Sequence, residues 1–191
     1  MKPPKTLHSK PNMTVSDIAD IFEIRTQFFP PDALKQFKIP APQCGNCPNF
    51  GRIWACPPFA DAELKKYQIK SAKIIAVKFR PLCTNLSAKQ YTDSVRKIFD
   101  PILLNLEKRA PRSLALLAGT CICPHAADCP RAKNLPCPTP EKMRPSPEAL
   151  GYDIPAIARQ MGIEILWQKN NTPPEYFTLI YFLAFSKACF L

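Results

Sequence analysis

The sequence predicts an α/β (α+β) fold, with a mixed sheet of about four strands, covering helices and two cysteine-rich metal loops. Short β-prone runs alternate along the chain with stretches in which apolar residues recur at helical spacing. Two cysteine-rich regions, predicted over 40–59 and 119–145, contain too much proline for regular structure. At 191 residues the chain can bury one core, so a single domain is expected over 13–191 behind a flexible basic leader over 1–12.

Local patterns place the first elements. Thr14 and Asp17 resemble a capping box, and the spacing of Ile18, Ile21 and Phe22 predicts a helix there. Further elements are expected in this order: a short helix near Pro31, one or two helical turns over 61–67, and a strand over 72–79.

A long helix is expected after Ser87, its N-cap. Its predicted apolar face is Tyr91, Val95, Ile98, Phe99, Ile102, Leu103 and Leu106. Pro101 within this pattern predicts a kink, or a restart capped by Asp100. The remaining elements are expected to be a strand over 114–118, a helix from Asp153 to Gly162, a strand over 163–167, a turn over 170–174 and a strand over 176–186.

The charge balance bears on possible partners. There are 26 Lys and Arg against 15 Asp and Glu, a formal charge of +11, which suits an anionic partner. Metal-bound thiolates would offset part of this excess, because two four-thiolate sites would lower the charge to about +7. No arginine-rich run accompanies the charge, so nucleic-acid binding is not expected.

The terminal segments indicate a cytoplasmic protein without a membrane span. No apolar stretch of the kind found in signal peptides follows the first residues. The segment 176–191 is apolar, but Lys187 interrupts it and it is shorter than the roughly 20 residues that a spanning helix needs. In a reducing cytoplasm, cysteines serve as metal ligands or reactive thiols rather than disulfides.

The nine cysteines form two groups and two isolated residues. Group one is Cys44, Cys47 and Cys56, spaced C-x2-C-x8-C, and group two is Cys121, Cys123, Cys129 and Cys137, spaced C-x-C-x5-C-x7-C. Five of these seven precede a proline, whereas the isolated Cys83 and Cys189 do not. Proline keeps the preceding cysteine extended and removes an amide that would need a partner, which suits a ligand loop.

Group two offers four thiolates within 17 residues, enough for one [4Fe–4S] cluster or one zinc ion. Its spacing lacks the second short C-x2-4-C pair of most structural zinc sites, so a cluster is favoured and zinc is the alternative. His125 lies inside this loop, as a surface residue or as a substitute ligand.

Group one has three thiolates, so its fourth ligand is remote or absent. A three-cysteine cluster would leave one iron free for a small ligand, as catalytic metals keep one open position. Alternatively, both groups share one site, or Cys83 completes group one. Arg52, Trp54 and Phe59 are candidates to shield a cluster from water or to serve ordinary packing.

Two long motifs resemble the signatures of a prokaryotic family of predicted metal-binding proteins, a domain of unknown function. The motifs are CGNCPNFGRIWACPPF, at 44–59, and PCPTPEKMRPSPEALGYDIPAIARQMGI, at 136–163. The resemblance implies metal binding, in an iron–sulfur form, without an assigned reaction. The family loop usually opens C-x2-C, whereas this chain has Cys121-Ile122-Cys123, so either one of the two is not a ligand or the loop is remodelled.

The second motif also carries local structure and a candidate cofactor contact. Ser146 and Pro147 are expected to start a helical turn that Gly151 ends. Arg144 follows Cys137 by seven residues, within reach of cluster sulfides or a bound anion. An ion pair of Arg144 with Glu141 or Glu148 is the alternative.

These observations predict an iron–sulfur protein with one or two [4Fe–4S] clusters, acting in electron transfer or small-molecule redox chemistry. Its partner would be a redox protein or a small-molecule ligand. Whether the chain is an enzyme with an open cluster stays undecided, since no G-x-S-x-G, P-loop, G-x-G-x-x-G or H-E-x-x-H motif is present. The alternative is a zinc-stabilised interaction or nucleic-acid-binding module that uses the basic surface.

Overall fold

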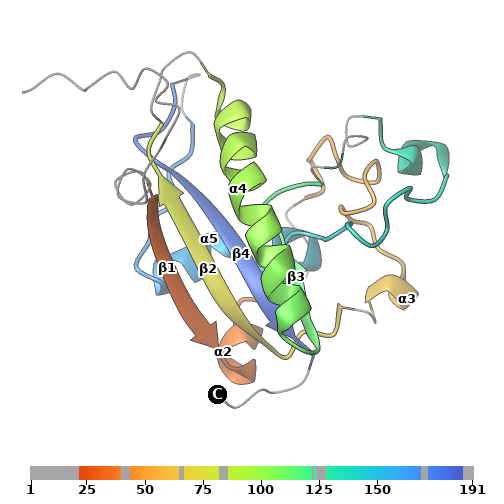
Figure 1. Ribbon diagram of the computed structural model, residues 1–191, viewed down its shortest axis with the longest axis horizontal. Helices are drawn as coiled ribbons and strands as arrows, with labels where there is room; N and C mark the ends of the chain where they lie inside the picture. The colour runs from red at the N-terminus through yellow and green to blue at the C-terminus, as the bar shows by residue number, and fades with distance from the viewer. Residues whose placement is uncertain are drawn as a thin grey trace, which may run out of the picture.

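The computed structural model describes residues 22–39, 44–64, 67–81, 86–121, 123, 128–168 and 172–186. Within these residues, four strands form one sheet in the order β1-β2-β4-β3 (Figure 1). The strands are β1 (Phe22–Phe29), β2 (Ser71–Phe79), β3 (Ser113–Leu116) and β4 (Phe177–Phe185). The predicted α+β class and four strands are confirmed, but all three pairings are antiparallel, so the sheet is not mixed.

Both faces of the central strands are buried, because apolar residues occupy consecutive positions along them. In β2, Ile74 faces one apolar cluster, whereas Ile75 and Val77 face another. In β4, Phe182 faces the same cluster as Ile74, and Tyr181 faces the same cluster as Ile75 and Val77. Successive side chains of a strand point to opposite faces, so the sheet needs a cover on each side.

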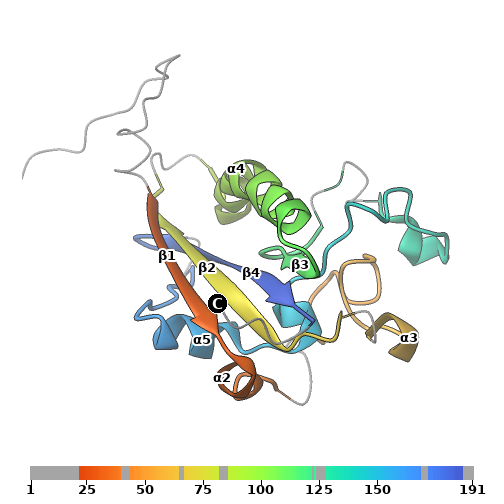
Figure 2. The same ribbon diagram turned by 60° about the horizontal axis from the view of Figure 1, so that its bottom comes forward.

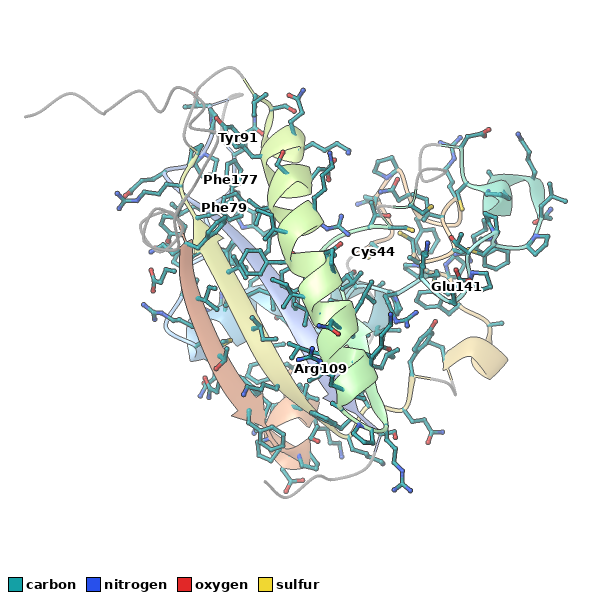
Figure 3. The ribbon with its side chains drawn as sticks, viewed as in Figure 1. Cys44, Phe79, Tyr91, Arg109, Glu141 and Phe177 are labelled. Carbon is teal, nitrogen blue, oxygen red and sulfur yellow. The ribbon has the colours of Figure 1, made fainter. Side chains whose placement is uncertain are left out.

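Helices supply these covers. Helix α4 (Ala88–Arg109) lies on one face, and α2 (Pro31–Lys35) and α5 (Ile154–Gln160) lie on the other (Figure 2). Under α4, Phe177 stacks on Phe79 and Tyr91, with ring centroids 5.5 and 5.8 Å apart (Figure 3). None of the described helices has the length and apolar character needed to cross a bilayer.

Helix α4 begins where the sequence predicts. Ser87 and Gln90 form a reciprocal capping box, in which the Ser87 hydroxyl accepts from the Gln90 amide. The helix then runs through Pro101 without interruption, so the predicted restart at Asp100 is wrong. The exposed Pro101 is tolerated at the cost of one backbone hydrogen bond.

The buried face of α4 is narrower than predicted. Its apolar contacts come from Tyr91, Val95, Phe99 and Leu103, whereas Ile98, Ile102 and Leu106 are 49%, 47% and 38% exposed. The buried side of the helix also contains Arg96 and Asp100, which are only 3% and 1% exposed. A buried ion pair on α4 therefore adjoins the apolar stripe, and it lies against the segment that leads into the second cysteine region.

Strand β1 was not expected from the sequence. The helix predicted from Thr14 lies outside the described residues except for Phe22, which is the first residue of β1 and not helical. Most side chains of this edge strand are exposed, so its sequence, FEIRTQFF, lacks the apolar alternation of a half-buried strand.

The strand predicted over 163–167 is also wrong. This segment has no regular structure and pairs with no described strand. Gly162, with φ +70°, ends α5, and the next residues place Ile163 and Ile165 against the same apolar cluster as α5. Alternating isoleucines here pack onto the face of the sheet rather than extend its edge.

Other local predictions are confirmed. Asp153 caps α5 by accepting from the Ala156 amide at 3.0 Å. The Ser146 hydroxyl accepts from the Ala149 amide at the 3-10 turn η4 (Glu148–Leu150), and Gly151 ends that turn with φ +78°. This turn joins the second cysteine region to α5.

Candidate metal centre

All seven cysteines of the two groups lie in one lobe beside the sheet, here called the cysteine lobe and defined as residues 44–64 and 119–143. Figures 1 and 2 both show its two segments side by side, near α4 and β3 and away from β1. It contains the short helix α3 (Asp61–Leu64) and the 3-10 turn η3 (Pro130–Lys133). Each of the seven is a free thiol; Cys129 is buried, Cys47 is exposed, and the other five are half-buried.

The first segment is a series of tight turns that begin or end at cysteines. The Cys47 amide donates to the Cys44 carbonyl at 2.8 Å, and the Cys56 amide donates to the Ile53 carbonyl at 2.9 Å. Gly51, with φ +70°, bends the chain so that its amide reaches the Pro57 carbonyl at 2.7 Å. These bonds satisfy backbone groups locally and involve none of the sulfur atoms.

Arg131, on η3, joins the second segment to the first. Its Nη1 donates to the Ile53 carbonyl at 2.8 Å and to the Cys56 carbonyl, and its Nη2 donates to the Pro58 carbonyl. The guanidinium also lies 5.1 Å from the Trp54 ring centroid, and the Trp54 indole donates to the Leu135 carbonyl at 3.0 Å. This Arg131 clamp fixes the two cysteine segments relative to each other.

A second contact ties the lobe to α4. The Arg96 Nη2 donates to Asp100 Oδ2 at 3.2 Å and also to the Thr120 carbonyl, at the start of the second segment. The Thr120 hydroxyl lies 3.3 Å from the Cys56 sulfur. Burial raises the pKa of Asp100, although the nearby Arg96 charge acts in the opposite direction. The buried ion pair thus positions a residue that touches a candidate ligand.

Glu148, the first residue of η4, carries a buried oxygen atom near the cysteine lobe. Its Oε2 is fully buried and has no hydrogen-bond partner among the described residues. Burial raises the pKa of Glu148, with a hydrogen bond from Ser146 and the charge of Arg96 opposing the shift. Its charge in turn contributes to the raised pKa of Cys44, which is on the side of the lobe that adjoins α4 (Figure 3).

The thiols perturb one another. Burial is the main cause of the raised pKa of Cys44 and of Cys56, and neighbouring cysteines add to it. Burial also raises the pKa of Cys121 to about 11, with further contributions from Cys123 and Cys137. Gathering several thiolates is therefore electrostatically costly in the absence of a cation, and a bound metal would offset that cost.

Arg144 makes no contact with a cysteine sulfur among the contacts that the structure describes. Its guanidinium binds the Glu107 carboxylate through Nε and Nη2, at 2.9 to 3.1 Å, and Nη1 donates to the Glu141 and Met143 carbonyls. The ion pair is thus with Glu107 on α4 rather than with Glu141 or Glu148. A role for Arg144 toward a cofactor stays a prediction.

The other residues that the sequence suggested for the metal loops lie partly within and partly outside the described residues. Arg52 is exposed, Trp54 belongs to the Arg131 clamp, and Phe59 packs on Tyr67 with centroids 5.9 Å apart. Cys83, His125 and Cys189 lie outside the described residues. In the part of the chain that the structure describes, no three Cys, His, Asp or Glu side chains stand close enough to hold a single metal ion.

Comparison with known proteins agrees with the chemistry of the lobe. The sequence model of the family described as "Predicted metal-binding protein (DUF2284)" matches residues 38–182. The chain belongs to this family. No curated protein and no solved structure matches it.

In this DUF2284 member, the donor set fits a metal. Seven unpaired thiols in one lobe, five of them followed by proline, are soft ligands suited to iron–sulfur clusters or zinc. The matched region includes both cysteine segments, the Arg131 clamp and Glu148. The cysteine lobe is therefore the part of the described chain whose donor chemistry suits a metal.

Sequence reasoning missed three residues that shape this lobe: Arg96, Thr120 and Arg131. Only Arg96 left a usable signal in the sequence. Arg96 and Asp100 are opposite charges four residues apart beside the apolar stripe of α4, which indicates a buried pair. Arg131 lies two residues after Cys129, but nothing in the sequence identifies carbonyls of the distant first segment as its acceptors.

Proposed function

We propose that this chain is an iron–sulfur protein that binds [4Fe–4S] clusters in the cysteine lobe and acts in electron transfer or small-molecule redox chemistry. The observation that carries the proposal is the gathering of seven free thiols from two distant segments into one lobe. Seven thiols exceed the four that one zinc ion takes. Bound clusters would supply one-electron chemistry at these cysteines.

The chain's own contribution is to hold and shield the ligands. The Arg131 clamp and the Thr120 contact fix the segments that carry the cysteines, and Ile53 and Ala55 form the buried floor between them. Burial and hydrogen bonds around cluster sulfurs tune the reduction potential. The partner in this proposal is a redox protein or a small-molecule ligand.

The test is anaerobic purification of the full chain, followed by metal and sulfide analysis. We expect a brown protein with absorbance at about 400 nm and equal amounts of iron and acid-labile sulfide. A colourless protein with stoichiometric zinc and no sulfide would overturn the proposal in favour of a zinc-stabilised module. Redox titration followed by EPR then measures whether the clusters cycle between oxidation states.

A further inference from the structure

We propose that two copies of this chain pair through strand β1, which joins their two sheets into one continuous sheet. The partner is a second copy of the same chain, related to the first by a two-fold axis that passes beside Ile24. The inference concerns an interaction surface and involves no metal, so it stands apart from the proposed function.

Strand β1 is an edge strand whose outer side is open. In the sheet order β1-β2-β4-β3, its strand neighbour among the described residues is β2 alone. The two strands pair one to one, from Phe22 with Phe79 to Phe29 with Ala72, so no bulge interrupts β1. Residues 23–27 are exposed, and β1 contains no proline or glycine. Soluble proteins usually protect such an edge, because its outer N–H and C=O groups can pair with another strand.

Exposed apolar side chains adjoin this edge on the face of the sheet that α4 covers. Ile24 pairs with Val77, which is buried under α4, so Ile24 points to the same face. Ile24 is nevertheless 52% exposed. On α4, the exposed Ile98, Ile102 and Leu106 follow one another at four-residue spacing and form a row along the helix.

This apolar row lies on the β1 side of α4. Ile98 and Asp100 precede and follow Phe99, so they lie about 100° to either side of it around the helix. Asp100 is on the side toward the cysteine lobe, where it binds Arg96. Phe99 itself contacts Phe22, the first residue of β1, with ring centroids 5.4 Å apart. Ile98 therefore faces the edge that β1 leaves open.

The charges of β1 select a second copy as the partner and set the register. Antiparallel pairing that places Ile24 opposite the partner's Ile24 also places Glu23 opposite the partner's Arg25, and Arg25 opposite the partner's Glu23. Phe22 then lies opposite the partner's Thr26. Pairs of opposite charge, and pairs of an aromatic with a β-branched residue, are favourable across strands.

The adjacent registers are unfavourable. Centring the pairing on Glu23 or on Arg25 would place like charges directly opposite each other. Within one chain, Glu23 already binds Arg25 and Lys78, and these exposed pairs remain available to extend across the axis. A two-fold interface requires a self-complementary surface, and β1 centred on Ile24 meets that requirement.

The pairing leaves the candidate metal centre accessible. Figures 1 and 2 show the cysteine lobe on the other side of the sheet's width from β1. Directly opposed residues of paired strands point to the same face, so both α4 helices lie on one face of the joined sheet. Their apolar rows then face each other across the axis, and the two cysteine lobes lie at the far ends of the dimer.

Analytical ultracentrifugation of the full chain tests the pairing. Wild type should sediment at about twice the 21.5 kDa mass of one chain. Ile24→Lys should raise the dissociation constant at least about tenfold, because two lysines then face each other at the axis. Leu64→Lys replaces a comparably exposed apolar residue of the cysteine lobe and should leave association unchanged. A monomeric wild type at about 100 μM, or equal association of the Ile24 variant and wild type, would overturn the pairing.

Single charge reversals test the register. Glu23→Arg gives a β1 with arginine at both positions, and Arg25→Glu gives one with glutamate at both, so each variant alone opposes like charges and should be monomeric. An equimolar mixture of the two should form a mixed dimer, because every arginine then lies opposite a glutamate. A mixture that stays monomeric, or a dimer of either variant alone, would overturn the proposed pairing.

Hydrogen exchange of the wild type gives a readout that does not depend on the variants folding. Such a readout is needed because Arg25 also donates to the carbonyls of Met161 and Gly162. Dilution below the dissociation constant should speed exchange of amides within 22–27 and leave those of β2 and β4 unchanged. Unchanged exchange at 22–27, or faster exchange throughout the sheet, would contradict pairing through β1.

Discussion

At the scale of single residues, the Arg96–Asp100 pair links the core to the candidate metal centre. Both side chains are almost fully buried, and Arg96 Nε and Asp100 Oδ1 have no hydrogen-bond partner in the described part of the chain. A buried ion pair with unsatisfied atoms contributes little net stability. We therefore infer that its role is to hold the Thr120 carbonyl rather than to stabilise the fold.

Replacing one or both members of the Arg96–Asp100 pair distinguishes a role in stability from a role in holding the Thr120 carbonyl. Asp100→Ala leaves the Arg96 charge buried without its partner, and should lower the free energy of unfolding by about 3 to 5 kcal/mol. Arg96→Met with Asp100→Leu removes both charges and should recover most of that loss. Urea unfolding of the two variants and wild type measures the difference.

The double variant should still lose the anchor of the lobe, because no guanidinium remains to bind the Thr120 carbonyl. Hydrogen exchange at residues 119–121 is expected to be faster than in wild type, and metal content lower. Lys89→Met with Asp93→Leu removes an exposed pair at the same spacing on α4 and should change neither measurement. Full metal content in the Arg96 and Asp100 double variant would show that the pair is only structural.

At the scale of elements, the short turn η3 contributes more to the centre than its length suggests. It has four residues, none of them buried, yet Arg131 on it reaches three carbonyls of the first segment. Hydrogen bonds from a charged group contribute about 1.5 to 3 kcal/mol each when well formed. The turn therefore acts as the connection between the two cysteine segments.

Arg131→Met should loosen the lobe without unfolding the sheet. We expect the backbone amides of residues 44–59 to exchange at least about tenfold faster than in wild type. A tenfold change in exchange corresponds to about 1.4 kcal/mol, which is less than the loss of one hydrogen bond from a charged group. Arg131→Lys keeps the charge but not the planar fork, and should give an intermediate rate. Hydrogen exchange followed by mass spectrometry measures these rates in the metal-loaded protein.

Lys133→Met is the matched control for Arg131, since it lies on the same turn and makes an exposed ion pair with Asp128 at 3.5 Å. It should leave exchange at 44–59 unchanged. Equal exchange rates in the Arg131→Met and Lys133→Met variants would mean that the clamp does not hold the segments together.

The helices and strands also show how far the sequence predicts the fold. Elements with a local signal were identified, such as α4 from its cap and β2 from its apolar run. Strand β1 was missed because five of its eight side chains are exposed, so the strand lacks the apolar alternation that sequence reasoning looks for. The segment 163–167 was misassigned because a strand requires a partner, and local sequence does not show that its isoleucines pack on the sheet instead.

At the scale of the whole molecule, the sequence selected the candidate ligands but did not show which parts of the fold lie next to them. All seven were recognisable from spacing and from the prolines that follow five of them. The proximity of Cys129 to the first segment depends on Arg131 and on carbonyls more than 70 residues away in the chain. Such long-range backbone contacts have no local pattern, so the position of Cys129 beside the first segment required the structure.

The two parts of the molecule also differ in what stabilises them. The sheet has a large apolar cluster on each face, whereas the described part of the cysteine lobe has only Ile53, Ala55 and Cys129 buried together. So small a core does not offset the entropy of ordering the roughly 45 residues of the lobe. Bound metal should therefore supply much of the stability of the lobe.

Metal removal should open the lobe and leave the sheet folded. After treatment with a strong chelator, amides of 44–64 and 119–143 are expected to lose most of their hydrogen-exchange protection, while those of β2 and β4 keep theirs. The same chelator saturated with metal beforehand is the control for non-specific effects. If β2 and β4 lose protection in parallel with the lobe, the chain is one cooperative unit, and the centre stabilises the whole fold rather than its own segments.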